Sequence, residues 1–487
     1  MPETAFKHMD LKRKTKIVCT IGPATSSPAV IERLIRAGMN VARLNFSHGS
    51  HDDHVRNIQT IRQVAGKLKT QVAILQDLSG PRIRTGALKE NEVQLNEGDS
   101  FTLTTDDILG DASAVSMSLS VLPGNVKPGD VIFLDSGAIK LTAVDTTATE
   151  VRCTVIIGGR LGWEKGINVP GVELTIPSYT ERDIDDLLLG LKHGVDFVAL
   201  SFVRDADDVL NLRRWLSTQE ADIPIIAKIE KWEASENLEK ILAVADGLMV
   251  ARGDLGVEIA IEKIPIVQKK IIRSCNQVGK PVITATQMLE SMIKSPFPTR
   301  AEVTDIANSI FDGTDAVMLS AETAIGKYPV KAVEVITRIA RETEAALPYA
   351  SMLLDKGANT EHITDDAISY AACNVAHRLG AAAIVAFTSS GSTARRVARY
   401  RPQNPIIAIT PNPAEVRRLL LSWGVYPYQV DNTLTVDKIF KHSVKLSLET
   451  GIAREGELIV ITAGIPVGIK GTTNLLKVEE VKRTTED

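Results

Sequence analysis

Short apolar runs alternate with amphipathic stretches along the first two-thirds of the chain. The runs are rich in Val, Ile and Ala and are not interrupted by polar residues, which is typical of strands buried on both faces. The expected strands are Thr15–Ile21, Asn40–Phe46, Gln71–Gln76, Asp196–Phe202, Ile223–Ile229, Gly247–Ala251, Pro281–Ala285 and Ala316–Leu319. Apolar residues recur at helical spacing between them, in Ala29–Ala37, Asp183–Leu191, Ala234–Val244, Val267–Val278 and Val330–Ala345. This alternation predicts an α/β fold, a (β/α)8 TIM barrel, and leaves a doubly wound open sheet as the alternative.

The helical periodicity stops between about Thr85 and Lys165. Thr, Ser, Val and Gly dominate that stretch around turns such as Lys127–Asp130, which predicts a small all-β domain inserted after the third barrel strand. Because active sites of such barrels lie at the C-terminal ends of the strands, an insertion there would cover the mouth of the barrel as a lid.

A third unit is expected after Pro348, beyond a polar linking segment at Asp355–Glu361. It repeats the strand and helix alternation and predicts an open α/β domain. Its expected helices are Asp365–Leu379, Thr393–Tyr400 and Ala414–Leu421, and its expected strands are Ala383–Phe387, Ile406–Ile409 and Leu458–Ile461. The predicted division is therefore 1–84 and 166–347 for the barrel, 85–165 for the lid and 348–487 for the C-terminal domain. A length of 487 residues fits about three domains.

Composition narrows the functional classes. Lys and Arg total 56 against 60 for Asp and Glu, and this net charge of −4 argues against a protein that coats nucleic acid. The four cysteines lie far apart without a CxxC pair, so neither a disulfide framework nor a zinc ribbon is indicated. No apolar run approaches the roughly 18 residues of a membrane span, and the polar stretch from Met1 to Lys16 lacks the apolar run that a signal peptide carries. We therefore expect a cytoplasmic protein with no membrane or nucleic-acid partner.

The expected barrel strands end in unusually polar sequences. These are Arg43–Gly49, Gln76–Arg84, Lys228–Glu230, Ala251–Gly256, Thr284–Gln287 and Ser320–Glu322. In a barrel they would converge on one mouth, where two carboxylates could hold Mg²⁺ and the cations beside them would suit a phosphoryl group in transfer. Taken singly, Lys228 and Glu230 could form a structural ion pair, and the Arg-Gly-Asp sequence at residues 252–254 could be a plain turn. Their shared position at strand ends favours the functional interpretation.

These motifs resemble the pyruvate kinase family, from Thr15 to about Val481. The resemblance is carried by the segments KTKIVCTIGPA, GMNVARLNFSHG, IIAKIEKWEA, MVARGDLGVE and ITATQMLESMIKSPFPTRAEVTDIANSIFDGTDAVMLSAET. It implies the same three-part fold and the transfer of the phosphoryl group of phosphoenolpyruvate to ADP, a glycolytic reaction that gives pyruvate and ATP. It also implies a homotetramer.

The resemblance assigns roles at matching positions. Lys228 would neutralise charge on the transferring phosphoryl group and on the enolate oxygen, and Arg43 would hold the phosphoryl group. Glu230 and Asp254 would bind Mg²⁺ or Mn²⁺. The nucleotide phosphates would contact Asn45, Phe46, Ser47, His48, Arg84 and Lys165.

The substrate carboxylate and the proton route are assigned in the same way. The amides of Gly253 and Asp254 and the hydroxyl of Thr286 would grip the carboxylate at a helix N-terminus, which favours anions. The proton that reaches the enolate would travel through Thr286, Ser320, Glu322 and water, and the sequence leaves the donor open.

A monovalent-cation site is also implied. Its potassium ligands would be Asn45, Ser47, Asp77 and the carbonyl of Leu78. Potassium-dependent members of the family carry Glu where this chain has Arg82. A fixed guanidinium could supply the charge that potassium provides elsewhere, so the ligands are present while dependence on potassium is left open.

The loop Thr388, Ser389, Ser390, Gly391, Ser392 and Thr393 joins an expected strand to a helix that carries Arg395 and Arg396. Small hydroxyl residues and Gly at a helix start can form a phosphate nest, or they can be a plain helix cap. Allosteric members of the family bind a sugar phosphate at this loop, so the resemblance implies a phosphorylated effector here.

Two other functional classes are weighed against this one. A Mg²⁺-dependent carbon–carbon lyase on the same barrel would need no nucleotide and no lid. A non-catalytic metabolite sensor would have no need to combine Lys228, Glu230, Asp254 and Thr286.

Overall fold

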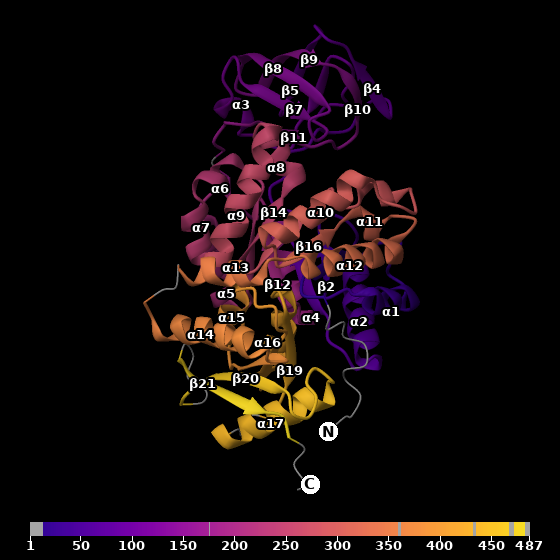
Figure 1. Cartoon of the computed structure of the whole chain (residues 1–487). Helices are drawn as coiled ribbons and strands as arrows, with labels where there is room; N and C mark the ends of the chain where they lie inside the picture. The colour runs from indigo at the N-terminus through magenta and orange to yellow at the C-terminus, as the bar shows by residue number, and fades with distance from the viewer. Residues whose placement is uncertain (1–12, 175, 359–361, 432–434, 467–471, 483–487) are drawn as a thin grey trace.

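The computed structural model describes residues 13–174, 176–358, 362–431, 435–466 and 472–482. Three bodies follow one another along the long axis of the molecule (Figure 1): a β domain at one end, a barrel in the middle and an α/β domain at the other end. Among the helices described, none is long and apolar enough to cross a membrane.

Within the described residues, eight parallel strands close into a barrel in the order β1-β16-β15-β14-β13-β12-β3-β2. Closure is direct, because β1 pairs with both β16 and β2, with Lys16 opposite Ala316 and Thr20 opposite Arg43. The TIM barrel is confirmed and the open sheet is excluded. The strands are β1 (Lys16–Thr20), β2 (Val41–Asn45), β3 (Ala73–Asp77), β12 (Phe197–Leu200), β13 (Ile225–Ile229), β14 (Gly247–Ala251), β15 (Val282–Ala285) and β16 (Ala316–Leu319).

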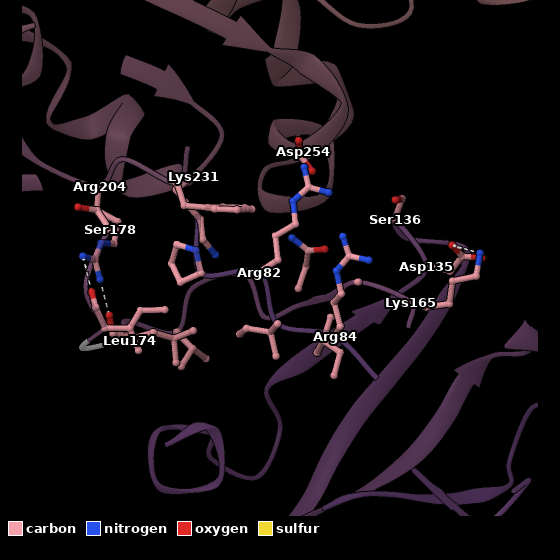
Figure 2. Close-up of a pocket in the computed structure, with 18 of the residues that line it drawn as sticks. Arg82, Arg84, Asp135, Ser136, Lys165, Leu174, Ser178, Arg204, Lys231 and Asp254 are labelled. Carbon is pink, nitrogen blue, oxygen red and sulfur yellow. Dashed lines mark hydrogen bonds and ion pairs between the residues drawn. The ribbon is translucent and has the colours of Figure 1, made fainter. Parts of the chain in front are cut away.

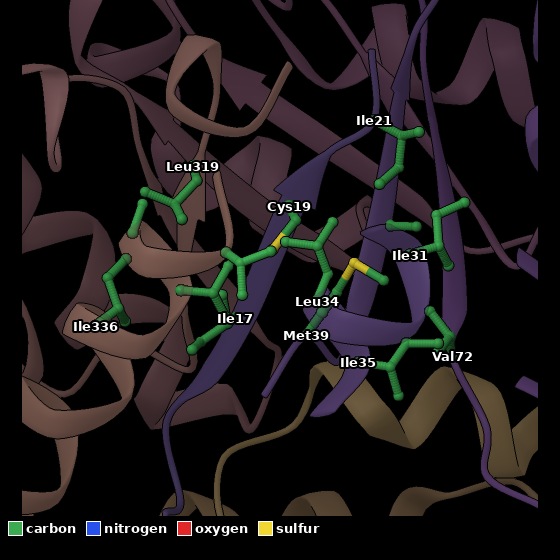
Figure 3. Packing of buried hydrophobic residues seen from close by; sticks show 14 of the residues in the cluster. Ile17, Cys19, Ile21, Ile31, Leu34, Ile35, Met39, Val72, Leu319 and Ile336 are labelled. Carbon is green, nitrogen blue, oxygen red and sulfur yellow. The ribbon is translucent and has the colours of Figure 1, made fainter. Parts of the chain in front are cut away.

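Helices surround the barrel, and apolar side chains fill the layer between strands and helices, such as Ile17, Cys19, Leu34 and Ile336 (Figure 3). The expected helix Ala234–Val244 is wrong in one respect, because it is broken at Asn237 into α6 and α7. The helices are α1 (Pro28–Ala37), α2 (His51–Lys67), α4 (Glu181–His193), α5 (Ala206–Thr218), α6 (Trp232–Glu236), α7 (Leu238–Val244), α8 (Arg252–Glu258), α9 (Ile264–Val278), α10 (Arg300–Asp312), α11 (Ala321–Ala324) and α12 (Pro329–Ala345), with short 3₁₀ turns η1 (Ile261–Lys263) and η2 (Glu290–Ile293).

The inserted segment is a β domain, as its lost helical periodicity predicts. It holds a six-stranded sheet in the order β11-β7-β8-β9-β5-β6 and a two-stranded sheet, β10-β4. Its last strand lies just beyond the expected end at residue 165, and its apolar cluster extends to Leu174. Its elements are β4 (Glu92–Leu95), β5 (Ser100–Thr104), β6 (Ala114–Ser116), α3 (Leu122–Asn125), β7 (Val131–Leu134), β8 (Ile139–Thr146), β9 (Glu150–Ile157), β10 (Gly159–Gly162) and β11 (Ile167–Asn168).

The C-terminal domain has a five-stranded sheet in the order β19-β18-β17-β20-β21. The expected linker is partly wrong, because Asp355–Gly357 continue a helix, while residues 359–361 lie outside the described part. The domain also packs against the barrel, since Leu420 and Leu421 belong to the same apolar cluster as the residues of the barrel interior. Its elements are α13 (Tyr349–Gly357), α14 (Thr364–Leu379), β17 (Ala383–Phe387), α15 (Ser392–Arg399), β18 (Ile406–Thr410), α16 (Pro413–Arg418), η3 (Leu419–Leu421), β19 (Val425–Gln429), α17 (Val436–Glu449), β20 (Leu458–Gly464) and β21 (Thr473–Glu480).

Candidate active site

Lys228 is the centre of a buried polar cluster at the C-terminal end of the barrel. Its Nζ lies 2.8 Å from Glu230 Oε1 and 3.2 Å from Asp77 Oδ1, and it donates a 2.7 Å hydrogen bond to Ser201 Oγ. Burial disfavours the ammonium, but the carboxylates of Asp77 and Glu230 outweigh it, so the pKa of Lys228 is raised. The side chain is therefore a fixed positive charge at neutral pH.

A second cation, Arg43, is held beside Lys228 by the same carboxylate. Arg43 Nε lies 2.6 Å from Asp77 Oδ2, and its Nη1 donates to Thr20 Oγ1 at 2.9 Å. Burial would raise the pKa of Asp77, but the charges of Lys228 and Arg43 prevail and lower it. Asp77 thus stays ionised and holds two cations next to each other, an arrangement suited to a phosphoryl group.

Glu230 and Asp254 form a pair of carboxylates that fits a divalent cation. Glu230 is buried, and its Oε2 accepts a 2.7 Å hydrogen bond from the amide of Phe202. Burial and then the negative charge of Glu230 raise the pKa of Asp254 to about 6. Two carboxylates close enough to oppose each other's ionisation are the oxygen donors that Mg²⁺ or Mn²⁺ uses, and a bound cation would relieve their repulsion.

Gly253 and Thr286 meet at a turn in an unusual backbone conformation. Thr286 has φ 67° and Gln287 has φ 56°, both in the left-handed region. Arg252 supports the turn, because its Nη2 donates to the Thr286 carbonyl at 2.6 Å while its Nη1 lies 2.6 Å from Asp305 Oδ2. The Gly253 amide donates to Thr286 Oγ1 at 2.9 Å. The expected helix start is confirmed, since α8 begins at Arg252 and so carries the amides of residues 253 and 254 in its first turn.

Ser320 and Glu322 lie at the end of β16. Glu322 is buried, and its carboxylate accepts the amides of Ser320 at 2.7 Å and Leu289 at 3.0 Å. The Glu322 carboxylate therefore joins the ends of neighbouring barrel segments.

A cavity of about 260 Å³ separates the barrel mouth from the β domain. His48, Arg84 and Lys165 of the expected nucleotide set line it, as does Asp254. Figure 2 shows Arg84, Lys165 and Asp254 among the lining residues. Lys165 Nζ lies 3.1 Å from Asp135 Oδ1 within the β domain. Partial burial, followed by the charges of Arg82, Arg84 and Arg43, lowers the pKa of His48. The cavity wall thus carries five Lys and Arg side chains against four carboxylates, and both domains contribute to it.

Other residues of the expected nucleotide and potassium sets form a tight loop after β2. Asn45 Oδ1 accepts the amide of Ser47 at 3.2 Å, and the Oγ of Ser47 is buried without a hydrogen-bond partner in the described structure. The ring of Phe46 is buried and stacks on His54 with 3.9 Å between centroids, so only its backbone can face a ligand. The Leu78 carbonyl accepts a 2.7 Å hydrogen bond from Ser201 Oγ.

Arg82 lies on the cavity wall near Asp254 (Figure 2). Its positive charge partly offsets the raised pKa of Asp254 and adds to the effect of burial that lowers the pKa of His48, whereas the lowered pKa of Asp77 comes from Lys228 and Arg43. The guanidinium therefore acts on the side of the site where phosphates would enter.

Sequence analysis missed several polar residues of this site. Thr20 ends the apolar strand β1, and Ser201 follows the apolar strand β12, so both lie at strand ends like the predicted site residues. They were not predicted, because a short hydroxyl side chain does not indicate that it bonds a charged residue such as Arg43 or Lys228. Arg204 and Lys231 line the cavity, and Arg252 supports the Thr286 turn. Arg252 lies in the polar strand-end segment Ala251–Gly256 but received no role, and nothing in the local sequence marks Arg204 and Lys231.

The expected effector loop joins β17 to α15. Gly391 precedes the helix with φ 75° and no side chain caps the helix start, which speaks against a plain cap. Ser390 and Ser392 line a second cavity of about 370 Å³ between the barrel and the C-terminal domain. Thr388 and Thr393 are buried, and Thr393 Oγ1 lies 2.8 Å from Thr473 Oγ1. Basic side chains of this second cavity are Lys280, Arg395, Arg396 and Arg418.

The sequence and the fold are similar to those of known proteins. A model described as the pyruvate kinase barrel domain matches residues 12–333, and one described as the pyruvate kinase alpha/beta domain matches residues 366–479. Pyruvate kinase of Geobacillus stearothermophilus is 49% identical over 474 residues, 97% of this chain and 81% of that protein. That of Clostridium acetobutylicum is 46% identical over 472 residues, 96% of this chain and 100% of that protein. A crystal structure of a pyruvate kinase from Cryptosporidium parvum has a TM-score of 0.92 and 38% identity, covering 97% of both chains. The chain belongs to the pyruvate kinase family, whose enzymes transfer the phosphoryl group of phosphoenolpyruvate to ADP.

Proposed function

We propose that the chain performs this transfer at the barrel mouth with Mg²⁺ or Mn²⁺ held by Glu230 and Asp254. The observation that carries the proposal is the buried Lys228 ammonium between Glu230 and Asp77, beside Arg43. When bound, the divalent cation would supply positive charge to the oxygens of phosphoenolpyruvate. The protein needs no covalent chemistry of its own, because such a transfer depends mainly on positioning and on charge stabilisation.

Lys228 and Arg43 have different electrostatic roles in this proposal. Arg43 has a guanidinium fixed by Asp77 and Thr20, so its remaining N–H groups can hold the phosphoryl group. Lys228 neutralises the charge that grows on the phosphoryl group and the enolate oxygen. Because both cations are held before substrate arrives, little reorganisation is needed during the reaction.

The other substrate contacts follow from the strand ends. The first-turn amides of α8, at Gly253 and Asp254, and the Thr286 hydroxyl bind the substrate carboxylate, replacing the present Gly253–Thr286 hydrogen bond. ADP lies in the cavity below the β domain, with its phosphates toward His48, Arg84 and Lys165. The loop of Asn45, Phe46 and Ser47 borders it. Thr286, Ser320 and Glu322 line the proposed proton route to the enolate.

The proposal also covers a candidate potassium site and whether turnover requires potassium. Asn45, Ser47, Asp77 and the Leu78 carbonyl are the candidate ligands, and the unpartnered Oγ of Ser47 supports a site there. Arg82 supplies positive charge nearby, so we propose that turnover does not require potassium.

We also propose regulation through the loop Thr388–Thr393. A phosphate held by Ser389 and Ser390 can affect the barrel only if it binds the active arrangement of domains more tightly than the inactive one. The second cavity supports such coupling, because barrel and C-terminal domain both line it. Saturation curves with sugar phosphates and AMP test this idea. A 5- to 150-fold lower half-saturating phosphoenolpyruvate concentration, roughly the usual allosteric range, is expected for one of them. The Ser389→Asp/Ser390→Asp variant should lose that response, and an unchanged response would reject the site.

A turnover assay tests the proposed function as a whole. Pyruvate formation from phosphoenolpyruvate should require ADP and a divalent cation, and should stop with EDTA. A carbon–carbon lyase would show no ADP requirement, and a sensor would show no turnover. The homotetramer stays a prediction, which sedimentation can check.

A further inference from the structure

An open groove of about 400 Å³ lies on the flank of the barrel, where α1 packs beside α12 (Figure 1). A 2.8 Å hydrogen bond from Thr337 Oγ1 to the Ala37 carbonyl joins the two helices there. The groove shares no lining residue with the cavity at the barrel mouth or with the second cavity at the effector loop. Its lining has one carboxylate, Glu334, against four basic side chains: Arg33, Arg36, Arg338 and Arg341. No step of the proposed reaction uses it.

The two helices present the arginines as two matched pairs. Arg33 and Arg36 are three residues apart on α1, and Arg338 and Arg341 are three residues apart on α12. Residues at this spacing share one face of a helix, with their Cβ atoms roughly 5–6 Å apart. Each helix therefore contributes two guanidinium groups that lie about one turn apart along the groove.

The positive charge of this groove is largely uncompensated. Arg33 and Arg338 are exposed, and their side chains form no ion pair within the described part of the chain. Arg36 pairs with Glu32 of its own helix at 2.9 Å, but these side chains are 43% and 46% exposed, so water and salt weaken the pair. The chain as a whole has a net charge of −4, so this excess of cations is a local feature.

Helix stabilisation accounts for only one of the four arginines. A cation in the last turn of a helix is favoured by the unpaired carbonyls there. Arg36 holds that position in α1, whereas Arg33 precedes the last turn and the last turn of α12 has no basic residue. Like charges one turn apart on a helix are unfavourable unless an anion accompanies them. The cluster therefore fits a ligand that carries several negative charges.

We propose that this groove binds a linear oligophosphate, a chain of three or more linked phosphate groups, with Arg33 and Arg338 as its principal contacts. Phosphate oxygens match the planar fork of a guanidinium group, which donates two parallel hydrogen bonds. A single phosphate meets one pair of arginines, whereas a chain runs along the groove and reaches both turns of both helices. Inorganic tripolyphosphate and the triphosphate of a nucleotide share this chemistry.

Arginine modification by phenylglyoxal, followed peptide by peptide with mass spectrometry, gives a local readout of the groove. At constant ionic strength, inorganic tripolyphosphate should slow the modification of Arg33 and Arg338. Orthophosphate should need at least about a tenfold higher concentration for the same protection, because it makes fewer charge-assisted contacts. Arg214 is the internal control, since it is an exposed arginine of α5 outside the groove and its modification rate should not change.

Two variants test the assigned contacts. Arg33→Gln/Arg338→Gln should raise the half-protecting tripolyphosphate concentration, now followed at Arg36 and Arg341, at least about tenfold. Glu334→Gln should lower that concentration, because it removes the one negative charge of the lining. Arg214→Gln is the matched control and should behave as wild type.

The outcomes separate this site from the active site. Arg33→Gln/Arg338→Gln should keep the wild-type kcat and KM without tripolyphosphate, so a failure at the groove leaves the proposed function untouched. ATP that protects at lower concentration than tripolyphosphate would identify a nucleoside triphosphate as the ligand, and equal or weaker protection by ATP would identify inorganic oligophosphate. Absence of protection at Arg33 and Arg338, equal potency of orthophosphate, or an unchanged half-protecting concentration in the double variant would overturn the proposal.

Discussion

Replacing Ser201 in the candidate active site removes a hydrogen bond that positions Lys228 but leaves the positive charge of Lys228 in place. Its hydroxyl accepts a 2.7 Å hydrogen bond from Lys228 Nζ and donates one of 2.7 Å to the Leu78 carbonyl. Both Ser201 and Lys228 are buried, so water cannot replace the lost partner. A charge-assisted hydrogen bond of this kind contributes about 1.5–3 kcal/mol, or roughly 10- to 150-fold in rate if the contact acts in the transition state. Because Asp77 and Glu230 still hold the ammonium, we expect Ser201→Ala to lower kcat by about 10- to 50-fold.

The assay is steady-state pyruvate formation with both substrates varied. KM for phosphoenolpyruvate should change less than kcat, since the contact strengthens as charge develops. The alkaline limb of the pH profile should move to lower pH, because the ammonium loses an acceptor and its pKa falls. Ser443→Ala is the control, since Ser443 is equally buried but bonds the Ile439 carbonyl in the C-terminal domain. A kcat for Ser201→Ala within about twofold of wild type, with an unmoved alkaline limb, would refute this reasoning.

Three further predictions concern other charged groups. Wild-type turnover should be similar in sodium and potassium buffers of equal ionic strength, and Arg82→Glu should create a need for potassium; strong potassium activation of the wild type would contradict this. Arg401→Met should destabilise the protein by about 3–5 kcal/mol, since it leaves the buried Asp315 carboxylate without its cation, and thermal unfolding measures the loss; an unchanged midpoint would count against it. Lys356, whose Nζ donates to Asn276 Oδ1 at 3.2 Å, has its pKa lowered to about 7 by burial and then by the charge of Arg401, so Lys356→Met should raise the thermal midpoint, most at or below pH 7. The folded pKa of about 7 lies below the ordinary 10.5, so the unfolded chain binds the extra proton between these values, and the wild type gains stability relative to the variant as the pH rises; a gap that does not shrink from pH 7 to 10 would contradict the assigned pKa.

The barrel could be predicted because its strands are buried on both faces and stand out as apolar runs. In the C-terminal part of the chain, one strand and one helix were not predicted from the sequence. The strand Val425–Gln429 contains Pro427, which argues against a strand interior, yet β19 is an edge strand where a missing N–H is tolerated. The helix over Tyr349–Gly357 was hidden by the polar Asp355 and Lys356, whose environment is set by tertiary packing.

The active site was predictable where a charged residue follows an apolar strand. That rule selected Lys228, Glu230 and Asp254, which the structure brings to one end of the barrel because strand ends of a barrel converge, and their catalytic roles stay predictions. It gave no role to Ser201 or to Arg252, although Arg252 lies in the polar segment Ala251–Gly256, because their partners are supplied by strands and turns distant in the sequence. The role of the Thr388–Thr393 loop follows from the resemblance to the family, because a helix start with small hydroxyl residues does not by itself distinguish a phosphate site from a cap.

The central claim is that the Lys228 ammonium stabilises charge in the transition state, and the kinetics of Lys228→Met test it most directly. Methionine keeps most of the side-chain volume but removes the charge, so kcat should fall by roughly 10³-fold or more while phosphoenolpyruvate binding, followed by calorimetry, changes much less. Lys16→Met is the matched control, because Lys16 is a buried lysine at the opposite end of the barrel whose Nζ donates to the Val425 carbonyl at 2.6 Å. The account predicts near-normal kcat for that control and a folded but almost inactive Lys228→Met. A Lys228→Met enzyme with kcat within about tenfold of wild type would contradict it.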